Sequence, residues 1–117
     1  MKIYLAGPMR GIPEFNFPEF HRYAKKLREQ GHTVFSPAEQ DIETYGCDIS
    51  KGIDSGSELE LVEKFGFDLR KTLCTDLSWI CLEADAVALM PEWKKSRGAQ
   101  AERATAIALG LNIIELE

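Results

Sequence analysis

The residue types best suited to chemistry lie in one segment near the C-terminal end of the chain, residues 96–110 (SRGAQAERATAIALG). Ser96 is a residue type that caps helix N-termini, and Gly98 lets a ligand approach the backbone closely. The free N–H groups of such a first turn, with the helix dipole, form a site for a phosphate group. Glu102 follows Gly98 by about one helical turn, a rise of about 6 Å. A phosphate bound at the start of this helix would therefore place a sugar carbon within reach of the Glu102 carboxylate.

Taken alone, Glu102 is also compatible with a solvated charge on a helix surface. The composition of the segment favours a helix packed closely against the protein, because small side chains recur along it: Ala99, Ala101, Ala104 and Ala108. A carboxylate near the binding end of such a helix is a candidate for chemistry.

The loop that follows the first predicted strand is the second candidate, with the sequence Gly7-Pro8-Met9-Arg10-Gly11. Glycines on both sides of an arginine expose backbone N–H groups and one cation, which suits a phosphate. The loop matches neither the dinucleotide-binding GxGxxG pattern nor a Walker loop. A structural turn is the alternative interpretation, and by the same reasoning Tyr4, three residues before it, would be a packing group.

Two further polar residues lie next to apolar ones. Asp76 falls between leucines on an amphipathic segment, and a carboxylate close to the core needs a partner or a function. Asn16 lies between Phe15 and Phe17, which could wall the pocket of a base. The two histidines are far from any cysteine or carboxylate cluster, so the sequence indicates no metal site.

Strands and helices alternate along the chain. The expected strands are residues 2–6, 32–36, 84–90 and 112–116, and the expected helices are 17–30, 68–82 and 98–109. Residues 38–66 are polar and glycine-rich, which predicts an irregular insertion with one short helix around 57–65. This order predicts one three-layer α/β domain over residues 1–117, flavodoxin-like or Rossmann-like, with a mostly parallel sheet of four to five strands and helices on both faces. Ligands in such folds bind at the carboxyl ends of the strands, here loops 7–15, 37–41 and 91–98.

Composition excludes several classes of protein. With 44% hydrophobic and 28% charged residues the chain is an ordinary globular domain. A net charge of −5 with dispersed basic residues argues against a nucleic-acid-binding surface, and no apolar run is long enough to cross a membrane. Three cysteines without a CxxC pattern predict free thiols in a reducing cytoplasm, with Cys74 and Cys81 as packing groups.

Three separated segments resemble the nucleoside 2-deoxyribosyltransferase superfamily, with the closest likeness to the 2′-deoxynucleoside 5′-monophosphate N-glycosidases and related small bacterial and phage proteins. The segments are YLAGPMRG (4–11), DLSWICLEAD (76–85) and SRGAQAE (96–102). They are similar to the opening strand and phosphate loop, to the helix-strand segment with an active-site aspartate, and to the phosphate-binding and nucleophile segment. A neutral serine at position 96, with Arg10 present, resembles the members that act on a 5′-phosphate.

The resemblance implies hydrolysis of the N-glycosidic bond of a nucleoside 5′-monophosphate, giving a free base and a (deoxy)ribose 5-phosphate. Glu102 would be the nucleophile, Tyr4 would orient it, and Asp76 would hold the substrate and assist departure of the base. The substrate-binding residues would be Gly7, Met9, Arg10, Gly11, Asn16, Ser96 and Gly98. The resemblance implies no metal or organic cofactor, and a homodimer or larger homo-oligomer.

Three other functions remain open from the sequence. The first is a transferase that passes deoxyribose between bases and needs an acceptor base. The second is a non-catalytic module that binds or sequesters a nucleotide, and the third is a structural or interaction protein.

Overall fold

The computed structural model describes all residues 1–117 as one α/β domain around a four-stranded sheet. All strand pairs are parallel, and the strand order is β2-β1-β3-β4. The strands are β1 (Lys2–Ala6), β2 (Thr33–Phe35), β3 (Ala86–Leu89) and β4 (Asn112–Glu115). The helices are α1 (Phe17–Glu29), α2 (Pro37–Tyr45), α3 (Glu58–Phe65), α4 (Leu69–Leu82) and α5 (Arg97–Ala108), with short 3-10 turns at Pro13–Asn16 and Trp93–Lys95.

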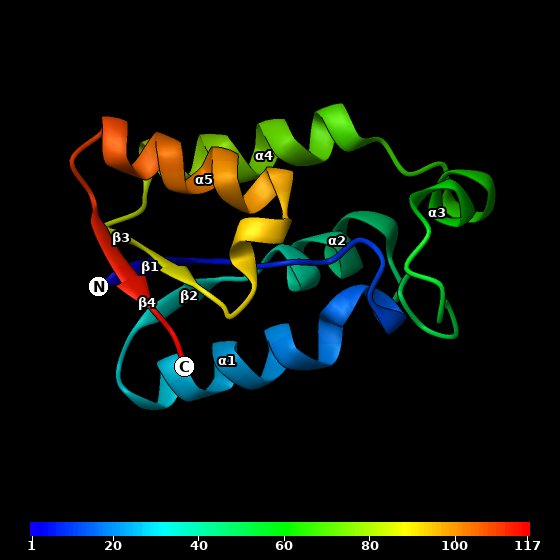
Figure 1. Cartoon of the computed structure of the whole chain (residues 1–117), viewed down its shortest axis with the longest axis horizontal. Helices are drawn as coiled ribbons and strands as arrows, with labels where there is room; N and C mark the ends of the chain where they lie inside the picture. Colours follow the sequence, from blue (N-terminus) through cyan, green and yellow to red (C-terminus); the bar gives the residue numbers. More distant parts are fainter.

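Helices cover both faces of the sheet. Figure 1 shows α1 on one side and the neighbouring helices α4 and α5 on the other. Apart from α2, which the sequence prediction lacks, the order of strands and helices along the chain is the predicted one. The prediction of a three-layer, Rossmann-like parallel sheet is therefore confirmed, with four strands.

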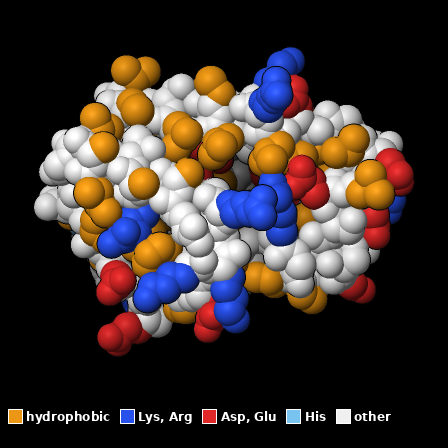
Figure 2. All heavy atoms as spheres, turned by 45° about the horizontal axis from the view of Figure 1, so that its top comes forward, with side chains coloured by type: hydrophobic (Ala, Val, Ile, Leu, Met, Phe, Trp, Pro, Cys, Tyr) orange, Lys and Arg blue, Asp and Glu red, His pale blue; other side chains and the backbone are white.

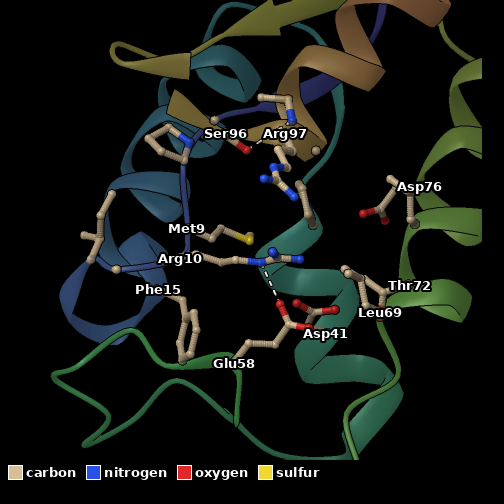
Figure 3. A pocket seen from close by; sticks show the side chains of 18 of the residues that line it. Met9, Arg10, Phe15, Asp41, Glu58, Leu69, Thr72, Asp76, Ser96 and Arg97 are labelled. Carbon is tan, nitrogen blue, oxygen red and sulfur yellow. Dashed lines mark hydrogen bonds and ion pairs between the residues drawn. The ribbon is translucent and has the colours of Figure 1, made fainter. Parts of the chain in front are cut away.

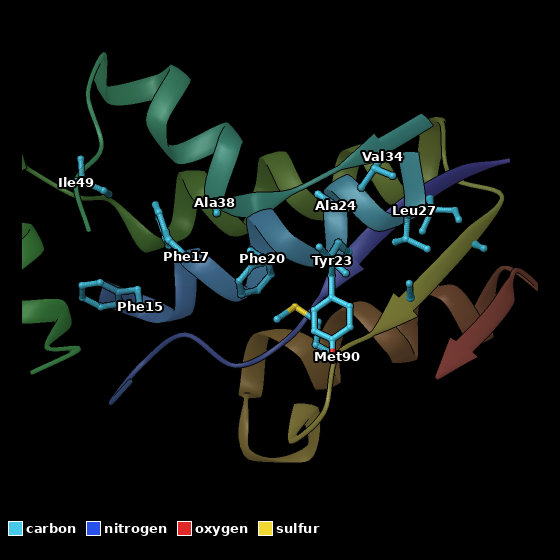
Figure 4. Packing of buried hydrophobic residues seen from close by; sticks show 14 of the residues in the cluster. Phe15, Phe17, Phe20, Tyr23, Ala24, Leu27, Val34, Ala38, Ile49 and Met90 are labelled. Carbon is cyan, nitrogen blue, oxygen red and sulfur yellow. The ribbon is translucent and has the colours of Figure 1, made fainter. Parts of the chain in front are cut away.

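The alternation of side chains in β1 explains why the sheet is buried on both faces. Ile3 and Leu5 pack with the apolar residues of α1, several of which are visible in Figure 4. Tyr4 and Ala6 point to the opposite side, where they pack with residues of α4 and α5. The side chain of Tyr4 therefore faces α5, the helix that carries Glu102.

The carboxyl ends of β1 and β3 lie side by side, since Ala6 pairs with Leu89. The loops that leave these strands therefore emerge at one edge of the sheet, as predicted for a ligand site. The amide of Met90 continues the ladder by donating to the carbonyl of Ala6 at 2.8 Å.

Residues 38–66 are more ordered than the sequence prediction of an irregular insertion, which is wrong for the first part of this segment. Pro37 occupies the first turn of α2 and Gly46 ends the helix with a φ of 74°, the proline-first, glycine-last pattern of a helix. The short helix expected around 57–65 is present as α3. Four apolar residues of the segment join the core with α1: Ala38, Ile49, Ile53 and Leu61.

The segment before α1 has an unusual backbone. Glu14, Phe15 and Asn16 all have φ between 51° and 62°, which is the left-handed region that costs non-glycine residues about 1–2 kcal/mol each. Contacts with the 46–66 segment hold this turn in place, because the amide of Glu14 donates to the carbonyl of Ile53 at 2.9 Å. This hydrogen bond joins the turn before α1 to the 46–66 segment.

Two smaller findings complete the fold. Cys74 and Cys81 are exposed free thiols, so the prediction that they are packing groups is wrong. No helix of the chain has the length and apolar character needed to span a membrane.

Candidate functional site

A cavity of about 550 Å³ opens at the carboxyl edge of the sheet. All three loops expected to bind a ligand contribute to its lining, together with residues of α3 and α4. Figure 2 shows a hollow on this face with basic and acidic side chains at its rim, and Figure 3 shows the residues around it.

Glu102 lies in this cavity and is only 6% exposed. Its carboxylate accepts a hydrogen bond from the hydroxyl of Tyr4, with 2.6 Å between the two oxygen atoms. The alternative that Glu102 is a solvated surface charge is therefore excluded. The pairing also gives Tyr4 a polar partner, in addition to its packing role.

The ring of Tyr4 is fixed by two other aromatic rings. Phe35 of β2 stacks on it with 5.4 Å between centroids, and Trp79 of α4 stacks on Phe35 at 5.0 Å. Tyr4 itself is completely buried. A buried ring with these neighbours holds its hydroxyl at one position, and the carboxylate of Glu102 is held with it.

Burial changes the acidity of this group strongly. Removal from water raises the pKa of Glu102 from 4.5 to about 8, the hydrogen bond from Tyr4 lowers it, and the charge of Asp76 raises it. Burial and the two neighbouring carboxylates together raise the pKa of the Tyr4 hydroxyl well above its ordinary value, so Tyr4 stays a donor. Glu102 is consequently a carboxyl group that exchanges its proton near neutral pH.

Two more buried carboxyl groups line the same cavity. Asp76 on α4 is 5% exposed, and its Oδ1 has no hydrogen-bond partner within the protein. Asp41 on α2 is 6% exposed. Burial raises the pKa of each of these groups from 3.8 to about 7. Buried acids with a free oxygen and a pKa near neutrality are typical of ligand sites, where they exchange protons with a substrate.

The start of α5 forms the other end of the cavity. The Ser96 hydroxyl oxygen accepts from the amide of Ala99 at 3.1 Å, which is the predicted N-cap. Gly98 also lines the cavity, and a side chain at this position would meet only Ser96 Oγ at 3.8 Å. The amides of the first turn have no carbonyl partner within the helix. Ala99 uses its amide for the cap and Gln100 donates to the carbonyl of Ser96 at 3.0 Å, so the amides of Arg97 and Gly98 remain available to an anion in the cavity.

Gly7 also lines the cavity, and close packing against Met90 requires a glycine at this position. A Cβ at this position would lie 2.8 Å from both Cβ and Sδ of Met90, so only glycine allows β1 and β3 to end this close together. Met9 and Gly11 also line the cavity, as predicted.

Arg10 lies at the cavity and is ion-paired. Its Nε is 2.6 Å from an oxygen of Glu58, the first residue of α3. The amide of Gly11 donates to the carbonyl of Gly56 at 3.0 Å, so two contacts join the loop after β1 to the approach to α3.

Asn16 is the one predicted substrate-binding residue that does not reach the cavity. Its side-chain amide donates to the carbonyl of Pro8 at 3.1 Å. Asn16 therefore braces the loop after β1 and is not one of the residues that line the cavity. Its neighbours Phe15 and Phe17 do line it.

Five charged residues that line the cavity have no predicted role from the sequence: Asp41, Glu58, Glu92, Lys95 and Arg97. Asp41 belongs to the part of the chain predicted to be irregular, so it has no predicted helical position. Glu58 falls in the short helix expected around 57–65, but the sequence does not predict that this helix packs against the loop after β1. Asp41 follows Pro37 by four residues, which places both on one face of a helix once that helix is recognised. Arg97 stands inside the SRG motif, in which the serine and the glycine are the residues with a predicted role.

The carboxylates, cysteines and histidines of the chain do not form a group of three or more that could hold a metal ion. The cavity thus combines three buried acids (Glu102, Asp76 and Asp41) with the N-terminus of α5 and two arginines, Arg10 and Arg97.

Comparison with known proteins adds a family to this geometry. A family model described as a domain of unknown function, DUF4406, matches residues 1–115. The chain belongs to the DUF4406 family. The match spans the whole sheet and all cavity-lining segments of this DUF4406 domain. No curated protein and no solved structure matches the sequence.

Proposed function

We propose that this DUF4406 domain hydrolyses the N-glycosidic bond of a nucleoside 5′-monophosphate, with Glu102 as the nucleophile. The observation that carries the proposal is a carboxylate 6% exposed, hydrogen-bonded to Tyr4 at 2.6 Å, in a cavity that also contains the N-terminus of its own helix. A phosphate at that N-terminus and a sugar directed inward would bring C1′ to Glu102, because the helical rise between the two is about 6 Å.

In the first step the ionised Glu102 attacks C1′ and the bond between C1′ and the base nitrogen breaks. The electron pair of that bond leaves with the base, which takes a proton from the carboxyl group of Asp76. A sugar ester of Glu102 is formed. The step uses the protonation state in which Glu102 is ionised, a form that the hydrogen bond from Tyr4 favours, and in which the proton lies on Asp76, whose pKa burial raises to about 7.

In the second step the Asp76 carboxylate takes a proton from water, whose oxygen attacks C1′ and releases the Glu102 carboxylate. The products are the free base and the sugar 5-phosphate, and both carboxyl groups return to their starting states. The two attacks at C1′ retain the configuration of the sugar overall, which is the logic of retaining glycosidases.

Asp41 would contribute to binding the base. It lies with Asp76 among the buried residues of the cavity and has no ion-pair partner. A carboxyl group there offers a hydrogen bond to the polar edge of a base. Phe15, Phe17 and Leu61 line the same cavity and would cover the apolar faces of the ligand.

Incubation of the purified protein with each nucleoside monophosphate, followed by chromatography, tests the proposal. The expected result is a free base and a sugar phosphate from the wild type and no product from E102Q, with both proteins showing the same thermal unfolding. Turnover that requires an added acceptor base would identify the reaction as base exchange instead. Tight nucleotide binding without product would identify a binding module, and unchanged turnover in E102Q would remove Glu102 from the mechanism.

A further inference from the structure

The cations of the cavity differ in whether they have a partner. Three basic residues line it: Arg10, Lys95 and Arg97. Arg10 pairs with Glu58 at 2.6 Å, and Lys95 pairs with Glu92 at 2.9 Å. Arg97 takes part in none of the ion pairs of the chain. It is therefore the one basic side chain at the cavity whose charge is not already neutralised within the protein.

Arg97 also lies at the start of α5, where backbone amides without a partner are available to an anion. It is the first residue of α5, between the capping Ser96 and Gly98, so its own amide, like that of Gly98, has no partner within the protein. Figure 3 shows the Arg97 side chain directed into the cavity from this position. A guanidinium group and helix amides that converge on one volume are a typical arrangement for a phosphate.

A buried acid on the wall formed by α4 indicates that a ligand binds in this cavity. Asp76 is 5% exposed, lines the same cavity and leaves its Oδ1 without a partner. Arg97 does not pair with it. A molecule with an anionic end at Arg97 and a hydrogen-bonding group at Asp76 would satisfy both groups at once.

We propose that Arg97 is the side chain that binds the substrate phosphate, and that Glu58 keeps Arg10 from that role. The resemblance noted above assigned this role to Arg10. The Arg10–Glu58 pair instead joins the loop after β1 to α3 and brings a carboxylate close to Arg10, where it competes with any incoming anion. The inference rests on the proposed function for the identity of the ligand as a sugar phosphate.

Titration with 2-deoxyribose 5-phosphate by calorimetry tests the assignment without requiring turnover. R97M should bind roughly 10- to 100-fold more weakly than wild type, because it loses a charge-assisted hydrogen bond. R97K should keep part of the affinity. The matched control is R70M, which removes one arginine from the exposed surface of α4 and should bind as wild type does.

The double variant R10M/E58Q removes the ion pair as a unit and leaves the net charge unchanged. It should bind within about threefold of wild type, since exposed ion pairs contribute little. Equal affinity in R97M and wild type would overturn the proposal, as would a loss in R10M/E58Q as large as that in R97M. Absence of sugar phosphate binding to the wild type would overturn it too. Thermal unfolding of each variant shows that the fold is intact.

The two proposals can fail separately. Weaker sugar phosphate binding in R97M without hydrolysis of any nucleotide would keep the Arg97 assignment and end the glycosidase proposal. Hydrolysis that is equally efficient in R97M and wild type would do the reverse.

Discussion

The hydroxyl of Tyr4 donates to the carboxylate of Glu102 at 2.6 Å, although the two residues are 98 positions apart in the chain. Strand β1 and helix α5 bring them together, and the rings of Phe35 and Trp79 hold the tyrosine in place. The contact stabilises the ionised form of a carboxyl group whose burial favours the neutral form. The ionised fraction of Glu102 therefore depends on both its burial and the hydrogen bond from Tyr4.

Y4F should move the pH dependence of kcat/KM toward higher pH. The hydrogen bond from Tyr4 lowers the pKa of Glu102, so its removal raises that pKa further above about 8. The nucleophile must be ionised, and each unit of pKa reduces the ionised fraction at pH 7 by about tenfold. Rates of base release from pH 5 to 9 provide the measurement. The matched control is Y23F, whose hydroxyl donates to the carbonyl of Glu117 away from the cavity; equal profiles for Y4F and wild type would contradict the role of Tyr4.

D41N should make the protein more stable at alkaline pH. Burial raises the pKa of Asp41 from 3.8 to about 7, so the folded protein keeps a proton that the unfolded chain has released. The stability from this proton is fully present below the unfolded pKa and is lost as pH rises through about 7. An asparagine cannot ionise and avoids this loss.

Urea unfolding at pH 4 and pH 8 measures the effect. The free energy of unfolding of D41N, relative to wild type, should rise by roughly 1–3 kcal/mol between these pH values. The exposed residue Asp54 supplies the control D54N, which should show no such change. A constant difference between D41N and wild type at all pH values would show that Asp41 ionises normally.

S96A should lose stability and ligand affinity together. The hydroxyl of Ser96 caps α5 by accepting from the amide of Ala99, and loss of such a cap costs about 1 kcal/mol. The proton of the Ser96 hydroxyl is not used in the cap and is available to a phosphate. We therefore expect S96A to bind 2-deoxyribose 5-phosphate roughly tenfold more weakly.

A second helix cap separates these two effects. Asp68 caps α4 by accepting from the amide of Lys71 at 3.2 Å and does not line the main cavity. D68A should lose about the same stability as S96A while it binds the sugar phosphate normally. Thermal unfolding and calorimetry on both variants make the comparison. An equal loss of affinity in D68A would mean that S96A acts only through the stability of the fold.

Much of the fold follows from local patterns in the sequence. The first three strands are short apolar runs followed within two residues by glycine or proline, and α1 has a clear 3.6-residue apolar period. Helix α2 could not be predicted in the same way, because most of its residues are polar and its buried face contains Asp41. The burial of a carboxyl group depends on the cavity around it, which no local pattern encodes.

In the candidate site, too, local spacing predicts some relationships between residues, and tertiary contacts determine the others. Ser96, Gly98 and Glu102 lie within seven residues of one helix, so spacing alone places them relative to each other. The pairing of Arg10 with Glu58 joins segments that are 48 positions apart, and it depends on how residues 46–66 pack on the loop after β1. The residues of that segment became part of the site only through tertiary contacts.

Trapping of the sugar ester on Glu102 tests the central claim most directly. A 2′-fluoro nucleoside monophosphate destabilises the oxocarbenium-like transition state and should allow the ester to accumulate. Mass spectrometry of a tryptic digest should then show the peptide of residues 98–103 heavier by one fluorinated sugar phosphate group, and E102Q should show no adduct. Release of base from the normal substrate with the added mass on another peptide, or in E102Q as well, would contradict the account.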